Sequence, residues 1–483
     1  MRSALTLTLA IDVGTTSAKV ALFDARGRRT LLLRRTLALR RLPGGGVEQD
    51  PEDYVRAVEG LLRRAAAHVP GGARVARAGI ACQRSTVVIW DRATGRPAGP
   101  AVTWMDRRAA PLVARLGKAA GAGEVARRTG LRLSAHYGAA HLARRFAAEP
   151  ALARGARRGE LVAGPVASFV LARLTGAPPA CDPTLAQRMS LYDPRRGRWD
   201  PWLCDLFGVP PVCLPVVRPS AGAWGGIRFG GRVIPILAMA GDQQCAAAAF
   251  DLDARAGTAL VHYGTGAFCL SPVPPGARAK EGLLLSVRAD RRGFYREGTV
   301  QAAGAALDAV AGAIGRAVLR RLIARRAPPA ALTSRSALLV PAFAGLGAPF
   351  WDDGARPVLM AESPPSPAQT VEAALAGIAH RVADGLEAAG RAARNGEILL
   401  SGPLAAIPAL AQFQADVTGR PVRIAIEPEA TLFGIARIAV RAHGETPPAA
   451  ARAGRALAPR TAPTERRALR RRWAAAVAAS RGD

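Results

Sequence analysis

The first apolar residues of the chain alternate with single residues that are mostly polar. Leu5, Leu7, Leu9 and Ile11 occupy every second position, which is typical of a β-strand. The chain then reaches a polar turn at residues 14–17 (GTTS), returns through the apolar run 20–23 (VALF), and turns again at residues 24–27. The pattern therefore predicts a β-hairpin that continues as a meander.

Later segments carry the signals of helices and of short buried strands. Asp50 is followed by Pro51 and two acidic residues, which is typical of a helix start, and apolar residues then recur at helical spacing. A second helix is expected to start at Ser366–Pro367, because an apolar stripe runs along the residues that follow. Strands are expected at 78–82, 86–90, 101–104, 233–239 and 398–400, a short helix at 245–250, and helices throughout 111–173.

One pattern occurs twice along the chain. Residues 259–266 (ALVHYGTG) repeat the strand followed by a Gly-Thr turn that residues 9–16 (LAIDVGTT) show first, as expected of two halves that each open with a hairpin. The length of 483 residues also exceeds what one hydrophobic core usually serves. We therefore predict an α/β chain of two domains, residues 1–246 and 247–445, with a cleft between them. Residues 446–483, rich in Arg, Ala and Pro, are expected to form a short helix and a solvated tail.

The formal net charge of +31 raises the question of nucleic-acid binding. Only three of the 67 basic residues are Lys, the arginines are spread along the whole chain, and aromatic residues make up 5%. A polyanion site instead concentrates charge on one face or tail and adds aromatic residues for stacking. The diffuse charge therefore argues against nucleic-acid binding as the main function, and we expect no nucleic-acid partner.

The spacing of cysteine and histidine indicates neither a zinc site nor a disulfide framework. The six Cys lack C-x-x-C pairs, and the six His form no HExxH or HxxxH pair. The cysteines are predicted to be small buried residues in a reducing compartment. No apolar run is long enough for a membrane span or a signal sequence, so we expect a soluble, cytoplasmic protein without a membrane partner.

Candidate groups for phosphoryl transfer occur at the ends of predicted strands. Such a transfer needs backbone donors around the phosphates, a carboxylate that holds Mg²⁺, and a base near the accepting hydroxyl. Asp12 ends the first strand just before residues 14–17, whose amides can cradle phosphate oxygens; an ordinary hairpin turn is the alternative. Asp242 lies between a buried strand and a helix and is a candidate base, with a helix N-cap as the alternative. The chain has no P-loop motif and no credible dinucleotide-binding motif.

Other polar and aromatic residues near these strand ends fit a substrate site. Gln83, Arg84 and Trp104 are candidates for binding hydroxyls and covering a sugar face. The alternative for Gln83 and Arg84 is an ordinary position at a strand edge, and the alternative for Trp104 is a core aromatic. Lys19 is a rare lysine in a chain that otherwise uses Arg, and its alternative is a surface position on the second strand.

Seven segments occur in an order and spacing that are specific to one family. They are 11–20 (IDVGTTSAKV), 81–97 (ACQRSTVVIWDRATGRP), 103–109 (TWMDRRA), 240–244 (AGDQQ), 262–268 (HYGTGAF), 341–352 (PAFAGLGAPFWD) and 412–416 (QFQAD). Together they resemble the FGGY carbohydrate kinases, the family of glycerol kinase and xylulokinase, over nearly the whole chain. The resemblance implies a two-domain, actin-like (ribonuclease H-like) ATPase fold and an enzyme that phosphorylates a hydroxyl of a small sugar or polyol with ATP.

The resemblance also implies roles for individual residues. Asp242 is expected to be the base that takes the proton from the attacking hydroxyl, and Asp12 and Asp242 are the acids expected at Mg²⁺, Asp12 through water. The substrate-binding residues expected are Arg84, Trp104, His136, Asp242, Gln243 and Phe268, and the nucleotide-binding ones are Thr15, Thr16, Ser17, Lys19, Gly264, Thr265 and Gly402. ATP and Mg²⁺ are the expected cofactors, a sugar or polyol is the expected partner, and a homodimer is an option. Closure of the two domains is expected to align donor and acceptor and to exclude water.

Two departures from the family pattern bear on the substrate and the nucleotide. Ser85 follows Arg84 where glycerol kinases have Glu, His136 aligns where they have Tyr, and the Met-His pair of xylulokinases is also absent. Loss of a carboxylate that accepts hydroxyl hydrogen bonds is expected to disfavour glycerol. Pro403 stands where the family has the second Gly of a Gly-Gly pair, so only Gly402 is carried over. These departures motivate an alternative function, a catalytically weak or inactive sensor that binds a sugar or nucleotide.

Overall fold

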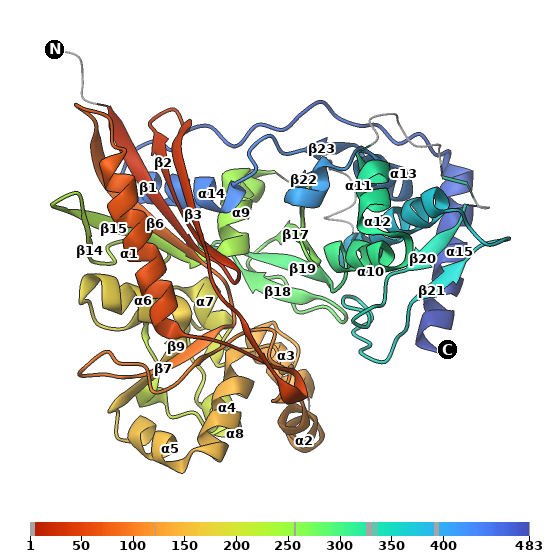
Figure 1. Ribbon diagram of the computed structural model, residues 1–483. Coiled ribbons are helices and arrows are strands. Elements are labelled where there is room, and N and C mark those ends of the chain that lie inside the picture. Colours follow the sequence, from red (N-terminus) through yellow and green to blue (C-terminus); the bar gives the residue numbers. More distant parts are fainter. Residues whose placement is uncertain are drawn as a thin grey trace. The chain divides into compact units, whose positions relative to one another are not determined.

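The computed structural model describes residues 5–120, 122–255, 257–324, 332–333, 336–390 and 396–482. The chain divides into two compact units (Figure 1). Unit 1 comprises Met1–Phe250, Ser286–Gly293 and Ala430–Ala450, and unit 2 comprises Asp251–Leu285, Phe294–Glu429 and Ala451–Asp483. Each unit is therefore built from segments that lie far apart in the sequence.

Unit 1 contains a six-stranded sheet of order β14-β15-β6-β1-β2-β3. Its strands are β1 (Thr6–Val13), β2 (Ser17–Asp24), β3 (Arg29–Thr36), β6 (Arg74–Cys82), β14 (Gly226–Phe229) and β15 (Arg232–Gly241). The strands β1, β2 and β3 pair antiparallel in succession, which confirms the predicted hairpin and meander. The strands β6 and β15 extend the sheet in parallel with β1.

The register of the three parallel strands brings their carboxyl ends to the same edge of the sheet. Val13 lies beside Cys82, and Cys82 lies beside Gly241. The segments that follow β1, β6 and β15 therefore leave the sheet side by side. In open α/β sheets this edge is where ligands usually bind.

Helices cover both faces of this sheet. On one face, α1 (Pro51–Ala67) and α6 (Val166–Thr175) pack on the apolar residues of β1, β2 and β6. The helix α1 begins as predicted, since the Asp50 side chain accepts a hydrogen bond from the backbone N–H of Glu52 and Pro51 is the first helical residue. On the other face lie α9 (Asp242–Ala249) and α14 (Ala430–Ala442).

The helix α14 lies very close to its neighbours in unit 1. A Cβ atom at Gly434 would lie 1.7 Å from the carbonyl oxygen of Cys245, and one at Gly79 would lie 2.8 Å from the Ile435 side chain. Both positions therefore need glycine. This close approach completes unit 1 with a helix from the last quarter of the chain.

A second sheet of unit 1 has the order β4-β5-β8-β7-β9. Its strands are β4 (Arg40–Leu42), β5 (Gly46–Gln49), β7 (Val87–Asp91), β8 (Ala101–Val102) and β9 (Leu161–Pro165). The helices in this part are α2 (Ala110–Ala120), α3 (Ala122–Thr129), α4 (Gly138–Ala148), α5 (Pro150–Arg157), α7 (Pro183–Gln187) and α8 (Pro201–Phe207). Two small ladders pair β10 (Ala180–Cys181) with β13 (Val216–Val217) and β11 (Tyr192–Asp193) with β12 (Arg198–Trp199).

The prediction of continuous helices over residues 111–173 was wrong at β9. Residues 161–165 pair antiparallel with β7. Four of these five residues are buried, so they form a short apolar run with no visible period. Such a run fits a buried strand and a buried helix equally well, and the pairing with β7 decides between them.

The sheet of unit 2 repeats the connections of the first sheet of unit 1. Its order is β18-β19-β17-β16-β22-β23, with β16 (Ala259–Tyr263), β17 (Ala267–Val273), β18 (Leu284–Val287), β19 (Phe294–Val300), β22 (Ile398–Ser401) and β23 (Val422–Ile424). The strands β16, β17 and β19 pair antiparallel, and β22 and β23 extend the sheet in parallel with β16. The sequence echo at residues 259–266 thus corresponds to a repeated topology.

The helices of unit 2 are α10 (Gly304–Ile314), α11 (Arg316–Ile323), α12 (Pro367–Ala389), α13 (Pro408–Thr418) and α15 (Pro463–Arg481), and β20 (Leu338–Val340) pairs with β21 (Val358–Met360). The helix α12 starts where predicted, with a capping box between Ser366 and Gln369. The last segment differs from the predicted short helix and solvated tail, because α15 has 19 residues and buries Leu469 and Trp473 in the core of unit 2. The prediction missed this apolar stripe because arginines dominate the composition of α15.

Two expectations from composition can be compared with the structure. All six cysteines are buried, which confirms their predicted role as small core residues. Among the residues that the structure describes, no helix is long and apolar enough to cross a membrane.

Candidate active site

The turn that joins β1 and β2 lies at the carboxyl edge of the first sheet of unit 1. The N–H of Gly14 donates to the carbonyl of Ser17 at 3.1 Å, and the N–H of Leu37 donates to the carbonyl of Thr16 at 2.9 Å. Ser17 is buried, Lys19 is half-buried and Thr16 is exposed. Thr16 is therefore the residue of this predicted phosphate turn that is most accessible to a ligand.

A buried glutamine, Gln83, holds the turn in place. Its amide oxygen accepts hydrogen bonds from the hydroxyls of Thr15 (2.8 Å) and Thr86 (2.9 Å). Its amide nitrogen donates to the carbonyl of Gly14 and to the hydroxyl of Tyr54, both at 3.1 Å. All four hydrogen-bonding positions of the amide are therefore used.

A second glutamine extends this network. The Tyr54 hydroxyl donates to the amide oxygen of Gln49, whose amide nitrogen donates to the carbonyls of Thr15 (2.9 Å) and Ala38 (3.0 Å). Burial raises the pKa of Tyr54, which keeps this hydroxyl protonated as a donor. The turn thus rests on a chain of buried side chains that the sequence alone did not reveal, since neither Gln49 nor Tyr54 belongs to a recognisable motif.

Asp242 is the first residue of α9, directly after β15. The N-cap position is occupied by Gly241, so the alternative interpretation of Asp242 as the N-cap is not what the structure shows. One carboxylate oxygen of Asp242 accepts a hydrogen bond from the N–H of Gln243 at 2.8 Å and lies 3.4 Å from Nε of Arg84. The Asp242 side chain is 37% exposed and that of Arg84 is 8% exposed, so a buried cation orients a carboxylate that solvent or substrate can reach.

Gly241, which precedes Asp242, is held by contacts with Arg84 and by hydrogen bonds that lead to the buried Asp182. A Cβ atom at Gly241 would lie 3.0 Å from Cδ of Arg84, so a side chain there would displace the arginine. The N–H of Gly241 donates to the hydroxyl of Thr184 at 2.7 Å, and Thr184 donates in turn to Asp182. Burial raises the pKa of Asp182 to about 6. Sequence reasoning missed this support, which is assembled from three separate segments.

Asp12 lies at the same edge as Asp242. It is buried on β1, beside Ala81 in the parallel register and opposite Lys19 across the hairpin. Burial raises the pKa of the Cys82 thiol, and the nearby carboxylates of Asp242 and Asp12 raise it further. Two strand spacings of about 4.8 Å separate β1 from β15, so the backbone of Asp12 lies roughly 10 Å from that of Ala240, two residues before Asp242.

The predicted substrate-binding residues of unit 1 gather beside the turn. The indole N–H of Trp104 donates to the Thr15 hydroxyl at 2.9 Å, and the Trp104 ring lies 5.2 Å from that of His136. Gln243 is buried at the start of α9. Ser85, which follows Arg84, has a φ of 69° and is 1% exposed, and its hydroxyl forms no hydrogen bond within the described part of the chain.

The remaining predicted residues lie in unit 2. Gly264 and Thr265 form the turn between β16 and β17, where their carbonyls accept hydrogen bonds from the first residues of α10. Gly402 follows β22 with a φ of 85°, and a Cβ atom there would lie 2.3 Å from the carbonyl oxygen of Tyr263. Phe268 lies on β17 between His262 and Thr299. Unit 2 therefore repeats the strand-end arrangement of unit 1 around a second Gly-Thr turn.

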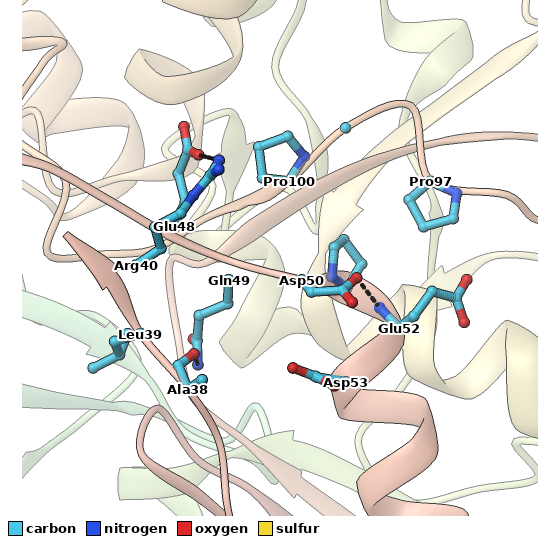
Figure 2. A pocket seen from close by; sticks show the side chains of 12 residues that line it. Ala38, Leu39, Arg40, Glu48, Gln49, Asp50, Glu52, Asp53, Pro97 and Pro100 are labelled. Carbon is cyan, nitrogen blue, oxygen red and sulfur yellow. Dashed lines mark hydrogen bonds and ion pairs between the residues drawn. The ribbon is translucent and has the colours of Figure 1, made fainter. Parts of the chain in front are cut away.

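A cavity of about 700 Å³ in unit 1 contains none of the predicted site residues (Figure 2). Its lining is Ala38, Leu39, Arg40, Glu48, Gln49, Asp50, Pro51, Glu52, Asp53, Pro97, Gly99 and Pro100. Two pairs of its lining residues are bonded to each other: Arg40 pairs with Glu48, and Asp50 accepts the N–H of Glu52. Gln49 is its link to the turn described above.

Models of one family match both parts of the chain. The N-terminal domain of the FGGY family of carbohydrate kinases matches residues 7–249, and the C-terminal domain of that family matches residues 259–443. The chain belongs to the FGGY family of carbohydrate kinases. The predicted family is therefore confirmed, and the protein is a carbohydrate kinase that phosphorylates a sugar or polyol.

Relatives of similar length carry the name glycerol kinase. One from Cereibacter sphaeroides is 36% identical over 454 residues, which are 89% of this chain and 89% of that protein. One from Methylobacterium nodulans is 37% identical over 459 residues, which are 91% of this chain and 90% of that protein. These relatives are kinases, and none of these comparisons favours the alternative of an inactive sensor.

Solved structures of kinases share the fold. The structure of Plasmodium falciparum glycerol kinase with ADP has a TM-score of 0.88 at 21% identity, covering 99% of this chain and 98% of that one. Xylulose kinase from Rhodospirillum rubrum has a TM-score of 0.84 at 20% identity, covering 98% of each chain. The predicted actin-like α/β fold is confirmed.

Proposed function

We propose that this kinase transfers the γ-phosphoryl group of ATP to a hydroxyl of a small sugar or polyol, with Asp242 as the general base. The observation that carries the proposal is the orientation of Asp242, whose carboxylate is held by the buried Arg84 and by the N–H of Gln243. A base has to lie within hydrogen-bond reach of the proton that it takes, and this carboxylate is partly exposed. The six buried thiols fit a reducing compartment, so we also propose that the kinase acts in the cytoplasm.

The proposed chemistry at Asp242 is a proton transfer coupled to phosphoryl transfer. The substrate hydroxyl oxygen forms a bond to the γ-phosphorus, the bond from that phosphorus to the bridging oxygen of ADP breaks, and Asp242 receives the hydroxyl proton. Arg84, Gln243, Trp104 and His136 are the proposed substrate-binding residues of unit 1. Phe268, on β17, is a further residue proposed to bind the substrate. In such a site, positioning of the hydroxyl supplies much of the rate.

The residues at the end of β1 fit Mg-ATP. Asp12 supplies a buried carboxylate oxygen, the ligand type that Mg²⁺ prefers, next to the turn formed by Gly14–Ser17. Among the residues that the structure describes, no group of three or more His, Cys, Asp or Glu is placed to hold a metal ion. Bound Mg²⁺ neutralises charge on the phosphate oxygens. We propose that Asp12 and Asp242 are the acids nearest to it.

Nucleotide contacts are proposed for both Gly-Thr turns. In unit 1 they are Thr15, Thr16, Ser17 and Lys19, and in unit 2 they are Gly264, Thr265 and Gly402. The Thr15 hydroxyl is engaged by Gln83 and Trp104, so we expect this residue to act through its backbone. In unit 2, Gly402 packs tightly at the end of β22, since a Cβ atom there would lie 2.3 Å from the carbonyl oxygen of Tyr263 and 3.0 Å from the His262 ring.

The test of this function is an ADP-release assay with Mg-ATP over glycerol, erythritol, pentuloses, hexuloses and aldonates. We expect turnover of at least one of these acceptors. Asp242→Asn is expected to lower kcat by roughly 100-fold or more with that acceptor, the usual range for a positioned general base. Near wild-type turnover of Asp242→Asn would remove it from this role, and no turnover with any acceptor contradicts the proposed activity.

A further inference from the structure

Four of the eight residues that line a cavity of about 490 Å³ in unit 2 are arginines. Four arginines come from α15, and the rest of the lining comes from α15, from the end of α13 and from α12. The lining residues are Glu387, Val417, Thr418, Arg466, Arg467, Arg470, Arg471 and Ala474. None of them is assigned to the phosphoryl transfer proposed above.

The arginines are spaced so that like charges lie next to one another. Arg466 and Arg470 are four residues apart on α15, and so are Arg467 and Arg471. Residues at this spacing are neighbours on one helix face, and like charges there destabilise a helix. Leu469 and Trp473 of α15 are buried in the core of unit 2, which fixes the orientation of the helix and keeps the four arginines at the cavity.

Carboxylates of the protein neutralise only part of this charge. Arg470 donates to Asp384 at 2.6 Å and to Glu387 at 2.9 Å. Glu387 is the one carboxylate that lines the cavity, and it is already paired with Arg470.

The other three arginines lack an acidic partner in the described part of the chain. The Arg466 guanidinium lies against Gly419 at the end of α13 and donates to the carbonyl of Thr461 at 3.5 Å. Arg467 and Arg471 are exposed and form no ion pair or hydrogen bond with the described residues. The cavity therefore has more guanidinium groups than carboxylates, and this excess of positive charge favours an anionic ligand.

We propose that this cavity binds a small polyanion that carries at least two phosphate groups. Guanidinium groups bind phosphate oxygens through paired, charge-assisted hydrogen bonds. The cavity volume is typical of sites for small organic ligands, and one orthophosphate ion would fill only a small part of it. A nucleic acid would instead need charge spread along an extended surface. Several guanidinium groups around one cavity favour two or more phosphates in a single small molecule.

The test measures binding of inorganic tripolyphosphate by calorimetry, without added metal and with saturating ADP to occupy the proposed nucleotide site. The pocket variant is Arg467→Gln with Arg471→Gln. Its matched control is Arg320→Gln with Arg321→Gln on α11, which also removes two exposed arginines from a helix of unit 2. We expect the wild type and the control to bind alike and the pocket variant to bind about tenfold more weakly or worse.

Equal affinity of the pocket variant and the control would overturn the proposal, and so would equally tight binding of orthophosphate, which would indicate an adventitious ion only. Glu387→Gln removes the carboxylate of the cavity and is expected to tighten tripolyphosphate binding several-fold; weaker binding contradicts the proposal. If the pocket variant loses affinity for duplex DNA by the same factor, the arginines belong to an extended nucleic-acid surface instead. None of these readouts depends on kinase turnover, so their failure is distinct from failure of the proposed function.

Discussion

Replacing Gln83 with leucine removes the buried amide that holds the turn between β1 and β2. Leucine has a similar volume but makes none of the four hydrogen bonds that Gln83 makes to Thr15, Thr86, Gly14 and Tyr54. The Thr15 hydroxyl would still accept from Trp104, and the Tyr54 hydroxyl would still donate to Gln49. The turn would then be held from one side only.

The hydrogen bonds allow a magnitude to be worked out. Each buried hydrogen bond contributes about 0.5–1.5 kcal/mol, and three of the four abandoned groups keep another partner, since the Thr86 hydroxyl also accepts from the N–H of Trp104 at 3.3 Å. We therefore expect the free energy of unfolding of Gln83→Leu to fall by about 2–4 kcal/mol. We also expect kcat/KM for ATP to fall, because a shift of about 1 Å in a group that positions the substrates costs as much as 100-fold in rate.

The assay compares urea unfolding with kcat/KM for ATP at a temperature where every variant is folded. The control is Ser168→Ala, which removes a buried hydroxyl in the same unit that donates to the carbonyl of Ala180 at 2.8 Å, away from the turn. We expect Ser168→Ala to lose about 1 kcal/mol of stability and to keep its kcat/KM, whereas Gln83→Leu loses both. If Gln83→Leu is destabilised but keeps the kcat/KM of the control, the amide supports the fold and does not position the turn.

Two further predictions concern a buried acid and the substrate site. Burial raises the pKa of Asp182 from 3.8 to about 6, so the folded state binds more protons, and this residue makes the wild type lose stability as pH rises from 4 to 6. Asp182→Asn removes that loss, on the order of 2–3 kcal/mol, and urea unfolding at several pH values checks it; parallel pH profiles of both proteins would contradict it. Ser85→Glu places a carboxylate beside Arg84 and is expected to raise kcat/KM for glycerol about tenfold or more, measured by ADP release. No gain with a folded variant would show that this position does not read the glycerol hydroxyls.

Local patterns predicted the elements that carry the candidate site. The alternation of residues 5–11 and the turn at 14–17 predicted the hairpin of β1 and β2, and the helix start at Asp50 was correct. The residues of β9 were misassigned, because a short buried run has no period of its own and the pairing partner β7 lies some 70 residues earlier in the sequence. The apolar stripe of α15 was missed, because arginines surround it.

The sequence by itself determined the family, the repeated Gly-Thr turn and the identity of the candidate acids, since motifs and turn chemistry depend on neighbouring residues. Only the tertiary structure decided that the ends of β1, β6 and β15 share one edge, because strand register is set by pairing between distant segments. The same holds for the amide network of Gln83, for the packing of α14 into unit 1 and for the arginine-lined cavity beside α15. Each of these depends on distances between side chains that are far apart along the chain, and such distances exist only once the core has formed.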